Sequence, residues 1–327
     1  LQAVLGEEEG YLRIVLGGGG GYGALVTRSG VRPYRIALTD TEAEALAAKL
    51  RRSTQLRGSR LPDYDVEAAH RLHAALLAPL AAEIATLKRL SIDAGGPLAA
   101  VPFAALVEAP PDAATAKRIA DDQDYSGVAW LARRTAVSSA VGPASFISLR
   151  RLGGAPDTLR VAAFGDFRPA PRAVAERLAK LRNLTPRCAE EVQRALQRLP
   201  ALPETEEEAQ LAAGLFGAAG TARVGERFSD TAFFDGVDVA AANVLLLATH
   251  GVLGLSSCFP EPALLTSLGG EGDGLIEASE LLDRRLSARL VILSACDTAG
   301  GARLDTARTG LSDGGEALSG LARGFLY

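Results

Sequence analysis

The sequence predicts a two-part α/β protein whose second half is built on a mostly parallel β-sheet with helices on both faces. The length of 327 residues suggests about two domains of roughly 150 residues each. After residue 160, short apolar runs alternate with helical segments, and two of these runs, at 243–251 and 289–296, are almost entirely apolar. Such strands are typical of parallel sheets that are covered on both faces.

The first half, residues 1–155, is predicted to be an accessory α/β half. Three strand-like runs separated by glycine-containing turns favour an antiparallel meander; they are YLRIVL (11–16), ALVTR (24–28) and VRPYRIAL (31–38). Thr39 and Glu42 form a capping-box pattern that opens a helix over 40–52. Residues 65–88 have helical spacing that Pro79 interrupts.

The second half, residues 156–327, is predicted to be the catalytic half, after a glycine- and proline-containing boundary at 149–160. Strands are expected at 160–167, 221–226, 243–251 and 289–296, and helices at 202–217, 229–237, 275–283 and from 314 onwards. For helix 202–217, Thr205 and Glu208 suggest a capping box, and Gly217 a stop.

Composition excludes several classes of protein. The net charge is −4 and the basic residues are scattered, so no nucleic-acid-binding surface is expected. There is no uninterrupted apolar stretch long enough for a membrane span and no signal peptide at LQAVLGEEEG, so a cytoplasmic protein is expected. Methionine is absent even at position 1. We therefore expect either that the sequence is a piece of a longer chain or that it lacks methionines that are modified in the protein.

The cysteines suggest neither a disulfide framework nor a metal site. Only Cys188, Cys258 and Cys296 occur, at scattered positions. This pattern favours a reducing compartment. Cys188 and Cys258 have no neighbouring histidine in the sequence, so they are interpreted as structural or incidental.

Polar residues follow the two most apolar strands. His250 and Gly251 end the run VLLLATHG, and Cys296 ends LVILSAC. The helix expected between the runs makes them a β-α-β unit, so the two strands should be parallel and adjacent. Since strands lie ~4.8 Å apart, His250 and Cys296 could meet at the carboxyl edge of the sheet, where α/β sheets bind ligands.

This pair suits nucleophilic catalysis. A Cys296 thiolate could attack a carbonyl carbon while His250 moves protons, and the backbone N–H groups of Gly251 and Cys296 could hold the oxyanion. The alternative interpretation is structural, because cysteine often fills core gaps and a histidine at a strand end often caps a turn.

Three segments together resemble the CHAT family of caspase-like proteins: LLLATHG, LVILSACDTAGG and GGEALSGLARGFLY. Upstream, ALVTRSGV, LHAALLAPL and LSIDAGGPLAAVPFAAL resemble the same family. The resemblance implies a caspase–hemoglobinase fold, peptide-bond hydrolysis by a His250–Cys296 dyad, and an accessory half that is a degenerate copy of the protease fold. It also implies a helical-repeat regulator, supplied by another domain or protein, and a role in bacterial defence or programmed cell death. Family chains usually continue beyond GFLY, so we expect this chain to be truncated at its C-terminus.

Other features carry weaker hypotheses. Gly18, Gly20 and Gly23 match a dinucleotide fingerprint, but the strand-like sequence that follows favours a hairpin turn. His70 and His73 share a helical face without a third metal ligand. Three acidic residues after the cysteine could line a pocket for a basic side chain or could simply cap the next turn and helix; they are Asp297, Asp313 and Glu316.

The sequence therefore predicts a cysteine endopeptidase that cleaves a protein partner and needs no metal or cofactor. Two alternatives remain open. One is a catalytically silent interaction module with the same fold. The other is a nucleotide-binding enzyme built on the glycine run at 17–23.

Overall fold

A computed structural model describes residues 1–54, 61–99, 101–152, 156, 158–252, 254–256, 258–284, 286–294, 321 and 324–325. The chain divides into two compact units, Leu1–Gly153 and Gly154–Tyr327. Each unit has its own hydrophobic core and is described by itself.

The first unit contains a five-stranded sheet in the order β3-β2-β1-β4-β5. Its strands are β1 (Glu9–Gly17), β2 (Gly20–Thr27), β3 (Val31–Ile36), β4 (Arg89–Ala94) and β5 (Ala136–Ser139). The first three form the antiparallel meander that the sequence predicted. β4 pairs in parallel with β1, and β5 pairs in parallel with β4. Gly17 pairs with Gly20, which has a φ of 101°. The glycine run is thus a hairpin turn with a strand after it, and the dinucleotide interpretation is wrong because that fingerprint must open a helix.

The helices of the first unit begin and end largely at their sequence signals. Thr39 caps α1 (Asp40–Ser53) in the predicted capping box. The interruption at Pro79 is confirmed: a 3₁₀ turn separates α2 (Val66–Leu76) from α3 (Ala81–Ile84). The remaining helices are α4 (Ala113–Asp122) and α5 (Pro143–Arg151).

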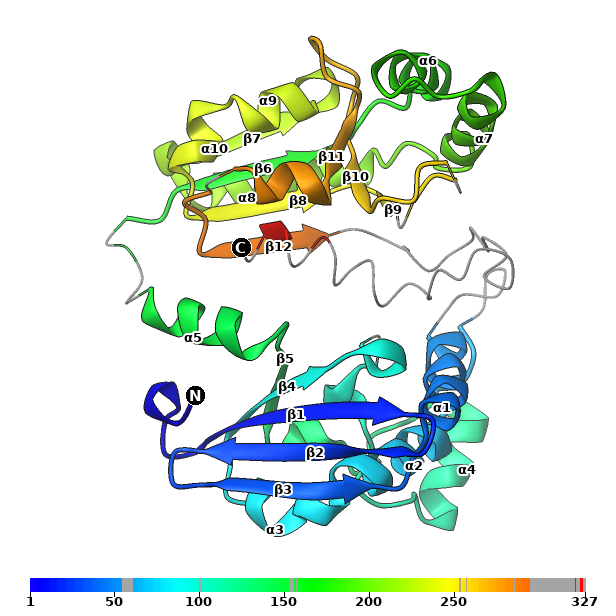
Figure 1. The fold of residues 1–327 in the computed structure, drawn as a ribbon, viewed down its shortest axis with the longest axis vertical. Coiled ribbons are helices and arrows are strands. Elements are labelled where there is room, and N and C mark those ends of the chain that lie inside the picture. The colour runs from blue at the N-terminus through cyan, green and yellow to red at the C-terminus, as the bar shows by residue number, and fades with distance from the viewer. Residues whose placement is uncertain are drawn as a thin grey trace. The chain divides into compact units, whose positions relative to one another are not determined.

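The second unit is centred on a parallel sheet in the order β12-β8-β6-β7, whose strands lie side by side in Figure 1. The strands are β6 (Val161–Gly165), β7 (Gly220–Val224), β8 (Val244–Ala248) and β12 (Leu290–Ser294). The two most apolar runs, β8 and β12, are parallel neighbours, as predicted.

Helices cover both faces of this sheet. On one face α8 (Glu204–Gly214) packs its alanines against Ala163 and Leu246. The close approach requires glycine in the sheet, because a Cβ at Gly165 would lie 2.2 Å from the Thr205 carbonyl oxygen. The other face carries the larger core, to which further helices contribute; among them are α6 (Pro171–Leu181), α7 (Pro186–Leu196), α9 (Asp230–Phe234), α10 (Val237–Ala241) and α11 (Ala278–Leu282). The short helix α10 contributes Val239 to this core and leads into β8.

A small antiparallel sheet lies between β8 and β12 in the chain. It contains β9 (Gly251–Val252), β10 (Ala263–Leu265) and β11 (Leu275–Glu277). The predicted helix 275–283 is therefore wrong over its first three residues, because they pair with β10 and are buried. The capping box at Thr205 is also wrong: its hydroxyl accepts from Asp166 N and donates to Leu202 O, a tertiary role that overrides the local pattern.

Within the described ranges, no helix combines the length and apolar character needed to cross a membrane.

Candidate functional site

The candidate site lies at the carboxyl edge of the parallel sheet. The register pairs Ala248 of β8 with Ser294 of β12. Thr249 N donates to Ser294 O at 3.2 Å, so the two strand ends are held together. His250 lies two residues beyond Ala248. Cys296 and the three candidate pocket residues, Asp297, Asp313 and Glu316, lie outside the described residues.

The His250 side chain is held by two segments from elsewhere in the unit. It is 8% exposed, and its Nε2 lies 2.9 Å from Pro200 O, in the loop after α7. Its ring also contacts Phe167 edge-on, with 5.6 Å between the ring centroids. A carbonyl oxygen can only accept, so Nε2 carries the hydrogen and Nδ1 is the nitrogen able to take a proton.

The backbone of His250 is fixed through its neighbours. Leu265 N donates to His250 O at 2.9 Å. The hydroxyl of Thr249, a fully buried residue, donates to Leu265 O at 2.7 Å. This bond gives the Thr249 hydroxyl, at the end of the apolar strand β8, the partner that a buried hydroxyl needs. Gly251, the expected oxyanion donor, begins β9 opposite Leu264.

The neighbouring strand β6 contributes Asp166 and Phe167 to the same edge. Asp166 has a φ of 53° and is 1% exposed. Its Oδ2 pairs with Arg168 at 2.6 Å, whereas Oδ1 has no hydrogen-bond partner in the described part of the chain. Neither residue was predicted from the sequence as part of a site, although a charged residue directly after an apolar strand was an available signal.

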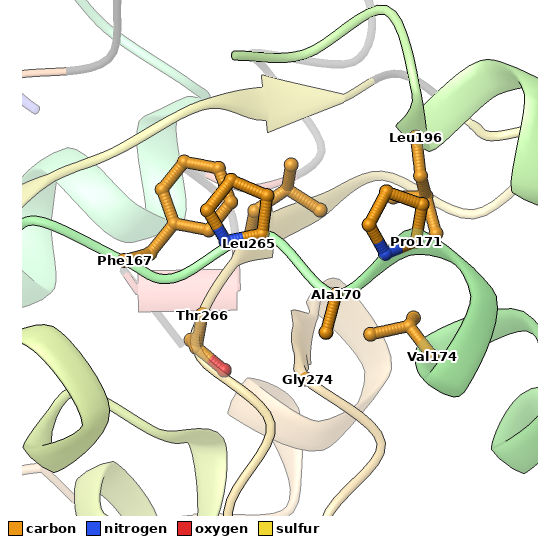
Figure 2. Close-up of a pocket in the computed structure, with 9 residues that line it drawn as sticks. Phe167, Ala170, Pro171, Val174, Leu196, Leu265, Thr266 and Gly274 are labelled. Atoms are coloured by element: carbon orange, nitrogen blue, oxygen red, sulfur yellow. The ribbon is translucent and has the colours of Figure 1, made fainter. Parts of the chain in front are cut away.

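A small apolar pocket adjoins Phe167 (Figure 2). Its lining residues are Phe167, Pro169, Ala170, Pro171, Val174, Leu196, Leu265, Thr266 and Gly274. The free space in it is about 10 Å³, room for about one water molecule. The side chains around Phe167 are therefore closely packed, and the pocket has no room for a substrate side chain in this conformation.

Cys188 and Cys258 are joined in a disulfide, with 5.8 Å between their Cα atoms. The scattered positions of the cysteines gave no expectation of this disulfide, because the fold brings together residues 70 positions apart in the chain. The bond links the first turn of α7 to the segment after β9. The cysteine count is thus no guide to the compartment.

A group of buried acidic residues lies at and beside β11, the edge strand of the small sheet opposite β9. Glu277 is completely buried and accepts from Arg182 Nη2 at 2.8 and 2.7 Å. Burial raises the pKa of Glu277 to about 7, although Arg182 acts to lower it. Burial also raises the pKa values of Asp273 and Glu280. These acids hold β11 and α11 in place and are not part of the His250 edge.

The described residues contain no group of three or more His, Cys, Asp or Glu side chains placed to bind a metal ion. His70 Nδ1 donates to Val107 O at 3.0 Å. His73 is buried, and burial lowers the pKa of its ring. Both histidines belong to the first unit and contribute to its packing.

A family model described as the CHAT domain matches residues 66–327, most of the chain. This domain family is caspase-like and related to proteases. A search of the curated proteins found no match.

Proposed function

The chain belongs to the CHAT domain family, and we propose that it is a cysteine endopeptidase that cleaves a protein partner through a His250–Cys296 dyad. The observation that carries the proposal is the strand register at the carboxyl edge. Ser294 pairs with Ala248, and in the sequence Cys296 and His250 each follow two residues later. Equal offsets beyond a parallel pair favour a meeting of the two side chains.

The histidine is held in a form that suits a general base. Because Nε2–H is engaged by Pro200 O, Nδ1 is the position that takes the thiol proton. The Cys296 Sγ then attacks the scissile carbonyl carbon. The C–N bond breaks as the His250 imidazolium returns the proton to the leaving amine, and His250 next takes a proton from the water that hydrolyses the thioester.

The other parts of the proposal rest on the sequence pattern. In this proposal the backbone N–H groups of Gly251 and Cys296 serve as oxyanion donors. A pocket for a basic substrate side chain is assigned to Asp297, Asp313 and Glu316. A helical-repeat partner or domain supplies regulation, and bacterial defence is the setting that the family suggests.

The test is covalent labelling. A peptide chloromethyl ketone should alkylate Cys296, and His250→Gln should reduce the rate by about 10²-fold or more, because it removes the base. His70→Gln is the matched control, since that histidine also bonds to a backbone carbonyl but lies in the first unit. Peptide mapping locates the label.

Rapid labelling of Cys296 that His250→Gln leaves unchanged would contradict the dyad. Folded protein whose Cys296 never reacts would favour the catalytically silent interaction module instead.

A further inference from the structure

The disulfide joins the helix that precedes the hydrogen-bond acceptor of His250 to the segment that follows His250 in the chain. Cys188 lies in the first turn of α7, and the same segment continues through Leu196 to the Pro200 carbonyl that accepts from His250. Cys258 lies eight positions after His250 in the chain, beyond the short strand β9. The bond thus closes a covalent loop that contains both the histidine and its hydrogen-bond acceptor.

The residues on either side of Cys258 are hydrogen-bonded to one another. Leu255 N donates to Phe259 O at 2.8 Å, and Phe259 N donates to Ser256 O at 3.0 Å. Cys258 N donates to Ser256 Oγ at 3.1 Å. Leu255 and Phe259 are buried in the core of the unit, so Cys258 lies at the tip of a turn with two buried anchors.

At the other end of the bond, α7 provides a rigid connection. Cys188 N donates to Thr185 Oγ1 at the helix N-terminus. Val192 and Leu196 anchor the helix in the core. The partial positive charge at a helix N-terminus favours a thiolate at Cys188, which makes this sulfur the better leaving group in thiol exchange.

Both cysteines are half-buried, so reductants can reach them. We propose that Cys188–Cys258 is a redox-active disulfide that a dithiol reductant opens and that controls the position of His250. Closed, the bond ties α7, and through it the Pro200 segment, to the segment that follows β9. Open, this covalent tie is lost, and each segment is held by its own packing and hydrogen bonds. A catalytic consequence of moving His250 rests on the proposed peptidase function. The opening of the disulfide and its effect on the His250 ring do not depend on that function.

The chemistry is a two-electron exchange. A thiolate of the dithiol attacks Cys258 Sγ, the S–S bond breaks, and Cys188 leaves as a thiolate. The second thiol of the reductant then attacks the mixed disulfide and releases Cys258. The reductant becomes a cyclic disulfide, and the protons from its two thiols pass through solvent to the two cysteines.

The experiment uses the whole chain with and without dithiothreitol, followed by alkylation and peptide mapping to score each cysteine. Backbone amide exchange is expected to rise by about tenfold in peptides covering 186–200 and 251–259 when the bond opens. The protein has three histidines, so His250→Gln assigns the His250 ring signal in the NMR spectrum. Reduction should move that signal and leave those of His70 and His73 unchanged.

Cys188→Ser with Cys258→Ser is the matched control. This double variant should resemble the reduced wild type, and dithiothreitol should change nothing further although Cys296 is still present. The proposal is overturned if non-reduced protein alkylates at both cysteines, or if the bond opens and the His250 signal does not move. A purely structural bond would alter stability and leave that signal in place. Neither readout uses peptidase activity, so failure here is separate from failure of the dyad.

Discussion

Glu277→Gln tests how burial controls ionisation beside the small sheet. The carboxyl group of Glu277 is fully buried and paired with Arg182, and its pKa is raised from 4.5 to about 7. The native state therefore keeps the proton to a higher pH than the unfolded state. The contribution to stability is complete below about pH 4.5 and is lost as the pH rises through 7.

The magnitude follows from the pKa difference. Each pKa unit corresponds to about 1.4 kcal/mol, so the wild type loses about 3 kcal/mol from this group over the whole range. About 2.5 kcal/mol of that loss falls between about pH 5 and about pH 8. Glutamine does not titrate, so the variant should lack this part of the pH dependence.

Urea unfolding of both proteins at these two pH values measures the effect. Any pH-independent cost of the substitution, such as a weaker bond to Arg182, cancels when the stability difference at one pH is subtracted from the difference at the other. Asp273 and Glu280 are present in both proteins and titrate in both. Glu271→Gln, at an exposed acid of the preceding loop, is the matched control. Its stability difference from the wild type should be the same at both pH values. Equal stability differences for Glu277→Gln at both pH values would refute the assignment of a raised pKa to this residue.

Two further substitutions test the packing around the His250 edge. Gly165→Ala places a Cβ 2.2 Å from Thr205 O, so we expect the free energy of unfolding in urea to fall by about 1–3 kcal/mol. Gly214→Ala on α8 is the control and should be neutral or stabilising, because a Cβ there meets nothing within 4 Å. Equal effects of the two substitutions would contradict the close approach of α8 to the sheet. Thr249→Val removes the bond to Leu265 O and should cost about 1–3 kcal/mol. Thr86→Val is the control and should change the midpoint little, because its exposed hydroxyl also donates to a backbone carbonyl, Glu83 O, where water can replace it. A neutral Thr249→Val would mean that the buried hydroxyl contributes nothing.

The parallel core of the second unit could be predicted because it depends on local pattern and chain topology. The runs at β8 and β12 are apolar enough to identify strands, and the chain between them is long enough for a crossover. The expected burial is confirmed for β8, whereas Leu290 and Ile292 of β12 are exposed. The hairpin at the glycine run was equally accessible, because a strand-like segment follows it. These features need no knowledge of which residues meet across the fold.

The errors arose where a tertiary partner outweighed a local signal. Thr205 has the spacing of a helix cap, yet its hydroxyl is used by Asp166 N and Leu202 O. Residues 275–277 have helical periodicity, yet they pair with β10. Cys188 and Cys258 show no sequence sign of pairing because 70 residues separate them. In each case the deciding contact is non-local, and propensity is only a weak prior against it.

The same distinction explains which parts of the site could be foreseen. His250 follows directly from its strand, because a strand end fixes where the next side chain emerges. Pro200 and Phe167 come from loops after α7 and β6, and nothing in their own segments indicates a histidine partner. Yet these two residues select the ring tautomer and orientation on which a base at Nδ1 depends. The strand pattern therefore locates the reactive group, whereas its chemical state is set by loops whose approach only the folded structure reveals.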